Sequence, residues 1–421
     1  MDKAQLPAGQ FLIERMGPLG DGASSGPRGQ LYVPFSLPGE EVTAEIEDGR
    51  LKLSGVLRPS PDRVSPICRY FGECGGCKLQ HWRLEPYLAW KRGLVVEALA
   101  AHDVTAPVAP TRDAHGAGRR RVTFHARRDG AVVHTGFMRA ASHRIVPIDA
   151  CPILVPGLEA AARIAGKIAE LMTRSGKTWT GKPLDIAMTA SEAGLDVTVK
   201  GPGPLQDKMR DAAIALADRC DLARLSNHNE VMVERRPPYI AIGPCRVLPP
   251  PGAFLQATTR GEEILARLVT EALGRAKHVA DLFCGIGPFA LRLASSTSVD
   301  AFDSDAASVA ALVKAAREIQ GLKPIKAEAR DLFRRPLLAA ELKACDAVVL
   351  DPPRQGAEAQ IRELARSALS RIVYVSCNPA TFARDAAALI QGGFRLESVT
   401  PVDQFRFSAH LELVGTFRRV K

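Results

Sequence analysis

The feature that most constrains the fold is an alternation of short apolar runs with helical patterns, which begins near residue 254 and continues toward the C-terminus. The strand-like runs occupy 278–283, 298–303, 347–350 and 371–375, and the segments between them have helical periodicity. Strands that alternate with helices of this length are typical of an α/β domain with a parallel, doubly wound sheet. We therefore predict such a domain over residues 251–421.

Three of these runs end in polar clusters that favour turns. The clusters are Asp281-Leu-Phe-Cys-Gly285-Ile-Gly287, Asp351-Pro-Pro-Arg354 and Ser376-Cys377-Asn378-Pro379. In an open α/β sheet, ligands bind outside the carboxyl ends of the strands. The sequence therefore predicts one shared site for a cofactor, a substrate and the Cys377 thiol, which we interpret as a nucleophile.

The first cluster indicates a nucleoside-binding site. Gly285 and Gly287 allow the backbone to approach a ligand closely, and Asp303 ends the next strand, where a carboxylate can bind ribose hydroxyls. The loop lacks the third glycine of a dinucleotide fingerprint, which favours S-adenosylmethionine over NAD. Asp331 either reads the adenine amino group or caps the turn before Leu332.

Length and charge restrict the remaining possibilities. A chain of 421 residues is long enough for two or three domains, and its net charge of +10 favours a polyanionic partner such as RNA or DNA. Seven arginines and one acidic residue lie between 119 and 144, so the arginines at 119–121 and 127–128 are expected to contact RNA phosphates. The alternative is that this hairpin is an ordinary solvated surface.

Nothing in the sequence predicts a membrane segment. No apolar run approaches the roughly 18 residues that a span requires, and the N-terminus lacks the apolar core of a signal peptide. We expect a cytoplasmic protein that is a monomer and does not contact a membrane.

Composition changes along the chain suggest four parts. Residues 1–58 contain short strands broken by glycine and proline, as in a small β-barrel. A cysteine-containing segment occupies 59–92, and a mixed α+β region that we expect to bind RNA occupies 93–250. The linker Pro249-Pro-Pro251 precedes the α/β domain of residues 251–421.

Four of the nine cysteines have the spacing of metal ligands. Cys68, Cys74 and Cys77 are separated by five and two residues, and Cys151-Pro152 is available as a fourth ligand. Thiolates suit iron–sulfur clusters and zinc alike, so the spacing alone leaves both open.

Five motifs together resemble a known family, the S-adenosylmethionine-dependent RNA uridine-5-methyltransferases that act on 23S rRNA or tRNA. The resemblance covers nearly the whole chain and rests on Phe254-Leu-Gln256, Asp281 to Gly287, Asp351 to Arg354, Val375 to Pro379 and His410-Leu-Glu412. Two departures are Ala257-Thr258 in place of the usual Val-Asn, and Asp303 where many members carry glutamate.

The resemblance implies a fold and a set of roles. The α/β domain would be a Rossmann-like class I methyltransferase domain, and the N-terminal barrel an OB-like TRAM domain. Cys377 would be the nucleophile and Glu412 the proton acceptor. The residues expected around S-adenosylmethionine are Gln256, Phe283, Gly285, Asp303, Asp331 and Asp351. The ligands expected for a [4Fe-4S] cluster are Cys68, Cys74, Cys77 and Cys151.

The expected activity is methylation of carbon 5 of a specific uridine, with 23S rRNA as the favoured substrate and tRNA as the alternative. A non-catalytic RNA-binding protein is a further alternative, against which the intact Asp351, Cys377 and Glu412 argue. An amino-methyltransferase usually carries an aromatic residue after its paired prolines, whereas this chain has Arg354. From its own surroundings in the sequence, Glu412 would be an ordinary strand residue, and only the family motif marks it.

Overall fold

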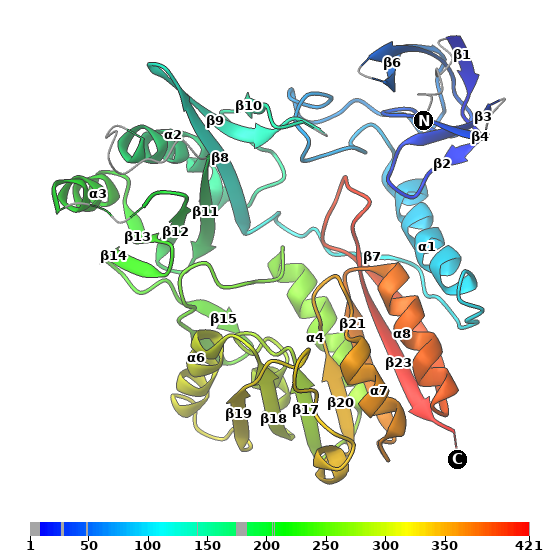
Figure 1. Ribbon diagram of the computed structural model, residues 1–421, viewed down its shortest axis with the longest axis vertical. Helices are drawn as coiled ribbons and strands as arrows, with labels where there is room; N and C mark the ends of the chain where they lie inside the picture. The colour runs from blue at the N-terminus through cyan, green and yellow to red at the C-terminus, as the bar shows by residue number, and fades with distance from the viewer. Residues whose placement is uncertain are drawn as a thin grey trace.

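The computed structural model describes residues 9–420, apart from 27–28, 48, 141, 174–182, 204 and 206. Figure 1 shows three groups of elements, with N-terminal strands at the upper right, a central sheet with two helices at the upper left, and a large α/β layer structure below. No helix among the described residues is long and apolar enough to cross a membrane.

The N-terminal region contains two antiparallel sheets of three strands each. One has the order β1 (Gly9–Leu12), β5 (Glu41–Glu47), β6 (Arg50–Arg58). The other has the order β2 (Arg15–Met16), β3 (Gly22–Gly26), β4 (Gly29–Val33). Side chains of both sheets share a small core that includes Phe11, Val33 and Val42. The short strands expected within residues 1–58 are therefore present.

The central region is a seven-stranded sheet covered by helices α2 (Ala161–Met172) and α3 (Asp207–Arg219). Its strand order is β10 (Ile145–Pro147), β9 (Val132–Met138), β8 (Arg121–Asp129), β11 (Leu184–Ser191), β12 (Gly194–Lys200), β13 (Leu222–Asn227), β14 (Glu230–Glu234). Ile164 and Ile168 of α2 are buried against this sheet, as their spacing of four on one helix face requires. Smaller elements are η1 (Pro156–Leu158), β15 (Ile240–Ile242) and β16 (Cys245–Val247).

The C-terminal region is built on an eight-stranded sheet. Its order is β19 (Ile325–Ala329), β18 (Ser298–Asp303), β17 (His278–Leu282), β20 (Ala347–Leu350), β21 (Arg371–Ser376), β23 (Glu412–Arg419), β22 (Phe394–Asp403), β7 (Arg112–Asp113). The first five strands are parallel, as predicted. β23 instead runs antiparallel to both neighbours, because it is reached from β22 by a short loop rather than a helical crossover.

Helices cover both faces of this sheet, which explains the nearly continuous apolar character of its central strands. Along β21, Val373 and Val375 face one core cluster, whereas Ile372 and Tyr374 face the other. The first face is covered by α4 (Thr259–Leu273), α5 (Ala290–Leu293) and α6 (Ala306–Arg317). The second is covered by α1 (Leu84–Ala100), α7 (Glu358–Arg366), α8 (Pro379–Gln391) and the short η2 (Glu341–Ala344).

Candidate active site

The three predicted motifs meet at one edge of the C-terminal sheet. They follow β17, β20 and β21, which are consecutive in the strand order, so their carboxyl ends lie next to one another. The antiparallel register pairs Ser376 of β21 with Leu413 of β23. Extending that pairing by one position brings Cys377 opposite Glu412, although 35 positions separate them in the sequence. The sheet thus joins the predicted nucleophile and the predicted base.

Cys377 and Glu412 influence each other electrostatically. Burial, followed by the charges of Glu412 and Asp351, raises the pKa of the Cys377 thiol to about 11, while Arg354 acts in the opposite direction. Burial and then the Asp351 charge raise the pKa of the Glu412 carboxyl well above its usual value. Both groups therefore favour their neutral forms in the free protein. Among the described residues, Glu412 Oε2 has no hydrogen-bond partner and is buried.

Two buried amides connect the acidic groups of the site. Gln404 Nε2 donates to Gln256 Oε1 at 2.5 Å and to Glu412 Oε1 at 3.2 Å. Gln256 Nε2 in turn donates to Asp351 Oδ2 at 3.0 Å. Burial raises the pKa of Asp351 to about 7. A hydrogen-bonded chain therefore runs from the predicted base to the predicted cofactor residues.

Sequence reasoning missed Gln404. It immediately follows β22 and precedes Glu412 by eight positions, a separation that matches no helix or strand period. The only available signal was a polar side chain at a strand end, and that signal is weak. Its role becomes visible only when β22 and β23 pair.

A buried ion pair fixes the loop that contains Gln404. Lys91 of α1 and Asp403 are both fully buried, and Lys91 Nζ lies 2.5 Å from Asp403 Oδ1. The same nitrogen donates to the carbonyl oxygen of His410 at 2.5 Å. One lysine therefore holds both ends of the loop between β22 and β23. This contact positions Gln404 and Glu412 relative to β21.

The glycine loop after β17 is braced by acidic side chains. Asp303 Oδ2 accepts a hydrogen bond from Gly285 N at 2.8 Å, and Asp281 Oδ2 accepts one from Ala290 N at 2.9 Å. Gly287 has a φ of +89°, and a Cβ there would lie 2.5 Å from Leu312. The loop conformation therefore requires glycine at 287. Asp303 retains free lone pairs for ribose hydroxyls, since each carboxylate oxygen accepts two hydrogen bonds.

Phe283 and Asp331 lie near the same end of the sheet. The rings of Phe283 and Phe333 have centroids 5.4 Å apart. Asp331 Oδ1 accepts a hydrogen bond from Phe333 N at 3.0 Å, so this carboxylate caps the turn that carries the ring. Asp331 therefore caps this turn, as one of the two interpretations expected. Its contact with a cofactor stays a prediction.

The four predicted metal ligands line a single cavity of about 860 Å³ together with Arg119. The cysteines concerned are Cys68, Cys74, Cys77 and Cys151. Burial raises the pKa of Cys77 to about 11 and that of Cys151 to about 12, and the neighbouring thiols contribute to both increases. The cysteines therefore converge although Cys151 is distant in sequence.

Hydrogen bonds between loops hold this convergence. Tyr70 Oη donates to Asp149 Oδ1 at 2.7 Å, which joins the loop of Cys68 to the loop of Cys151. Gly75 N donates to Met138 O at 2.9 Å, and a Cβ at Gly75 would meet the same carbonyl oxygen at 2.9 Å. Glycine is therefore needed at position 75, because the loop between Cys74 and Cys77 approaches β9 closely there.

The prediction that all the clustered arginines contact RNA is wrong for Arg120. Arg120 is buried, donates to the carbonyl oxygen of Gln256 at 3.0 Å and forms an ion pair with Glu262. Arg121 donates to the carbonyl oxygen of Ala253 at 3.0 Å. These guanidinium groups hold the linker at Ala253 and the backbone at Gln256 in place. Arg127 is exposed and stays available to a polyanion.

Comparisons with known proteins agree with this arrangement. Residues 250–419 match the family described as tRNA (Uracil-5-)-methyltransferase. An RNA methyltransferase of Brucella suis is 47% identical, with 98% of each chain covered. The 23S rRNA (uracil(1939)-C(5))-methyltransferase of Vibrio vulnificus is 30% identical, with 97% of this chain and 96% of the relative covered.

A solved structure has the same fold. It is the Pyrococcus abyssi tRNA (uracil-54, C5)-methyltransferase in complex with S-adenosyl-L-homocysteine, with a TM-score of 0.72 and 24% identity over 97% of this chain and 99% of that one. The expected fold class, with a methyltransferase domain and an N-terminal region rich in strands, is confirmed. Sequence similarity over the full length and the shared motifs show that this chain is an enzyme of the RNA uracil-5-methyltransferase family.

Proposed function

We propose that this enzyme methylates carbon 5 of one uridine in 23S rRNA, with S-adenosylmethionine as the methyl donor and a covalent bond between Cys377 and the uracil. The observation that carries the proposal is the register of β21 and β23, which sets Cys377 opposite Glu412 beside Asp351 and the glycine loop. This arrangement contains a thiol, a buried carboxyl group and a nucleoside-binding loop at one sheet edge.

The chemistry requires these groups in a fixed order. Carbon 5 of uracil is a poor nucleophile, so the Cys377 thiolate first adds to carbon 6 and converts the ring to an enolate. Carbon 5 then attacks the sulfonium methyl group. Glu412 removes the proton from carbon 5, after which the carbon–sulfur bond breaks and the thiolate leaves. The uridine has to be flipped out of its stack to reach a thiol at this depth.

Some residues around the site would bind only the cofactor, and others would lie between the cofactor and the uracil. Asp303, with the backbone around Gly285, would hold the ribose of the cofactor, and Phe283 would contact its base. Gln256 and Asp351 would lie between cofactor and uracil, since their side chains are hydrogen-bonded to each other at 3.0 Å. Asp331 would contact the cofactor from the turn that precedes Phe333. Asp303 and Asp351 come from the ends of β18 and β20, whereas Gln256 comes from the segment before α4.

The four cysteines fit an iron–sulfur cluster better than a single zinc ion. Thiolates around one zinc ion lie roughly 3.8 Å apart, given Zn–S bonds of about 2.3 Å in a tetrahedron. Although all four cysteines belong to the described part of the chain, no three of their sulfur atoms lie within 4.8 Å of one another. A four-iron cube holds its ligands farther apart than one ion does. We propose that Cys68, Cys74, Cys77 and Cys151 hold a [4Fe-4S] cluster that organises this surface.

The choice of 23S rRNA rests on sequence similarity. The Vibrio vulnificus rRNA enzyme is similar over 97% of this chain, and so includes the cysteine segment and the N-terminal strands. tRNA is the second candidate, because the matching family model carries that description.

The deciding experiment maps 5-methyluridine in rRNA and tRNA from a strain that lacks this protein. We expect one uridine of 23S rRNA to lose its methyl group, and re-expression of the wild-type chain, but not of the Cys377→Ala chain, to restore it. Loss of a methyl group in tRNA alone would assign the alternative substrate. An unchanged methylation map would contradict the proposed activity.

A further inference from the structure

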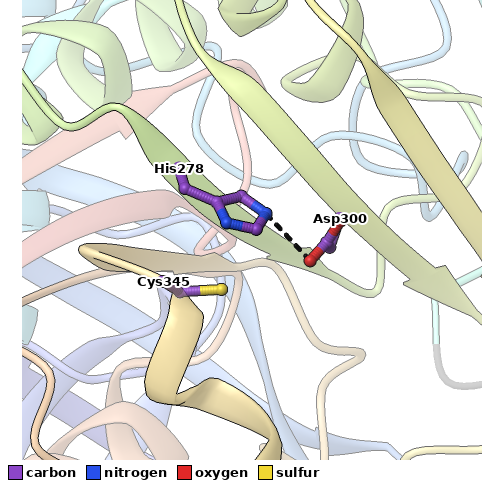
Figure 2. Close-up of side chains that lie close together, drawn as sticks. All are labelled: His278, Asp300 and Cys345. Carbon is purple, nitrogen blue, oxygen red and sulfur yellow. Dashed lines mark ion pairs between the residues drawn. The ribbon is translucent and has the colours of Figure 1, made fainter.

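Figure 2 shows a second group of metal-ligating side chains, which lies at the opposite edge of the same sheet. His278 is the first residue of β17, Asp300 the third residue of β18, and Cys345 lies between η2 and β20. The strands β18, β17 and β20 are neighbours, so their amino-terminal ends bring these residues together. The proposed active site is at the carboxyl ends, which makes this group separate from methyl transfer.

The three side chains present one nitrogen, one oxygen and one sulfur ligand. One such atom from each residue lies within 4.8 Å of the others, and His278 Nε2 is 2.9 Å from Asp300 Oδ2. The exposed fractions of the His278 and Asp300 side chains are 27% and 25%, so an ion can reach them from solvent. Ligand atoms around zinc lie roughly 3.2–3.8 Å apart. The three ligand atoms are therefore close enough for side-chain rotations to bring them to zinc-binding separations.

The orientation of His278 is an independent observation. Its Nδ1 lies 3.1 Å from the carbonyl oxygen of Ala344. A carbonyl oxygen only accepts hydrogen bonds, so Nδ1 carries the proton, and in the neutral ring Nε2 presents its lone pair. That lone pair is directed at the Asp300 carboxylate. Nε2 and the Asp300 carboxylate oxygen are therefore two ligand atoms that face each other 2.9 Å apart.

The backbone around this group is fixed. Asp346 Oδ2 accepts hydrogen bonds from Lys277 N at 2.7 Å and from His278 N at 3.1 Å. Asp346 N donates to His278 O at 2.9 Å, which ties the start of β17 to the start of β20. Histidine ligands in metal sites commonly donate their other ring nitrogen to a carbonyl or carboxylate, as His278 does to Ala344. The site is therefore preorganised.

We propose that His278, Asp300 and Cys345 form a zinc site that links the amino-terminal ends of β18, β17 and β20. Zinc accepts nitrogen, oxygen and thiolate ligands together, and three protein ligands leave a fourth position for water. Binding releases the thiol proton of Cys345 to solvent as the zinc–sulfur bond forms. The ion would brace the sheet at the edge remote from the active site.

The test uses the full-length protein, purified anaerobically, with Co²⁺ and Zn²⁺ as probes. Equilibrium dialysis gives the number of ions bound by the wild-type chain and by His278→Gln, Asp300→Asn and Cys345→Ser. Cys220→Ser is the matched control, because this half-buried thiol belongs to the separate core of the central sheet. The cysteine cavity contributes equally to every chain, so the differences report on this group alone, whether or not a cluster is present.

We expect each site variant to bind one ion fewer than the wild-type and Cys220→Ser chains, and Cys345→Ser to show a weaker sulfur-to-cobalt absorption band than Cys220→Ser. Zinc at about a hundred times its Kd should raise the melting temperature of the wild-type chain by on the order of 5 °C, and that of His278→Gln hardly at all. Equal stoichiometry and equal melting shifts in all chains would overturn the proposal and leave a simple ion pair of His278 with Asp300. The His278→Gln amide can still hydrogen-bond to Asp300, which keeps the variant folded.

Discussion

Gln404 donates a hydrogen bond to Glu412 Oε1 at 3.2 Å, inside a core where neither side chain is more than 3% exposed. The same amide nitrogen donates to Gln256, so a single side chain restrains the proposed base and a proposed cofactor residue together. A Cβ on Gly261 of α4 would lie 2.7 Å from Gln404 Oε1, so the amide has little room to rotate. We therefore propose that Gln404 positions Glu412 for the elimination step.

Replacing Gln404 by methionine should keep the volume and remove both hydrogen bonds. Glu412 has to be ionised when it acts as the base, and a hydrogen bond to a charged group contributes about 1.5–3 kcal/mol, so we expect kcat to fall about 10- to 100-fold with little change in the KM for RNA. Gln355→Met is the matched control, since Gln355 is exposed near the site and should retain full activity. Equal kcat values for both variants, measured by methyl transfer at saturating RNA, would contradict this role.

Cys377 and Glu412 should fail at different steps of the reaction. Cys377→Ala cannot activate carbon 5, so neither methyl transfer nor a covalent complex is expected. In Glu412→Gln, the thiolate should still add to carbon 6 and carbon 5 should still be methylated. The proton on carbon 5 should not be removed, so the carbon–sulfur bond stays intact and a methylated RNA–protein adduct accumulates. Denaturing electrophoresis after incubation with radiolabelled S-adenosylmethionine distinguishes them. An adduct with Cys377→Ala would refute the nucleophile assignment, and normal turnover by Glu412→Gln would assign proton removal elsewhere.

The rate of a single turnover should rise with pH. The pKa of Cys377 is raised to about 11 and that of Glu412 is also raised, so the ionised form of each group becomes more abundant as pH increases. While the thiolate is limiting, the rate should increase about tenfold per pH unit between roughly pH 6 and 9. Rates at saturating RNA, with the melting temperature measured at each pH as a control, provide the test. A rate that falls over this range would contradict it.

Asp351→Asn should stabilise the protein at alkaline pH. Burial raises the pKa of Asp351 from 3.8 to about 7, so the folded state holds this proton more tightly than the unfolded state does. The stability that this group contributes is complete below about pH 4 and is lost as pH rises toward 7. Asparagine cannot ionise and can still accept from Gln256. We expect the variant to melt several degrees above wild type at pH 8 and by a smaller margin at pH 5, and a reversed order would be inconsistent with the buried acid.

The cysteine cavity should contain iron. Anaerobically purified wild-type protein should be brown, with about four irons per chain and visible absorption from thiolate-to-iron charge transfer. Cys77→Ser or Cys151→Ser should lose most of the iron and of the visible absorption. Cys220→Ser should keep the iron and the absorption, because Cys220 lies outside the cavity. Stoichiometric zinc without iron in the wild-type protein would exclude the cluster.

Much of the fold and of the candidate site was accessible from local patterns. The strand ranges 298–303 and 347–350 match β18 and β20, because buried parallel strands produce continuous apolar runs that end at turn residues. The rule that ligands bind at the carboxyl ends of such strands was enough to group Asp281, Asp351 and Cys377. Cysteine spacing identified Cys68, Cys74 and Cys77, and these line one cavity with Cys151, the candidate for the fourth ligand.

Other features depended on partners that are remote in the sequence. The clustered arginines resembled a nucleic-acid surface, but Arg120 pairs with Glu262, which is 142 positions away, and no local charge pattern shows that partner. Glu412 resembled an ordinary strand residue until the antiparallel pairing of β23 with β21 set it opposite Cys377. The proposed zinc ligands share no sequence period, because His278 lies in β17, Asp300 in β18 and Cys345 in the segment before β20. Local patterns determine which segments become strands and helices, because period and turn chemistry are local. Only tertiary packing decides which side chains meet across strands, since that depends on sheet order and register.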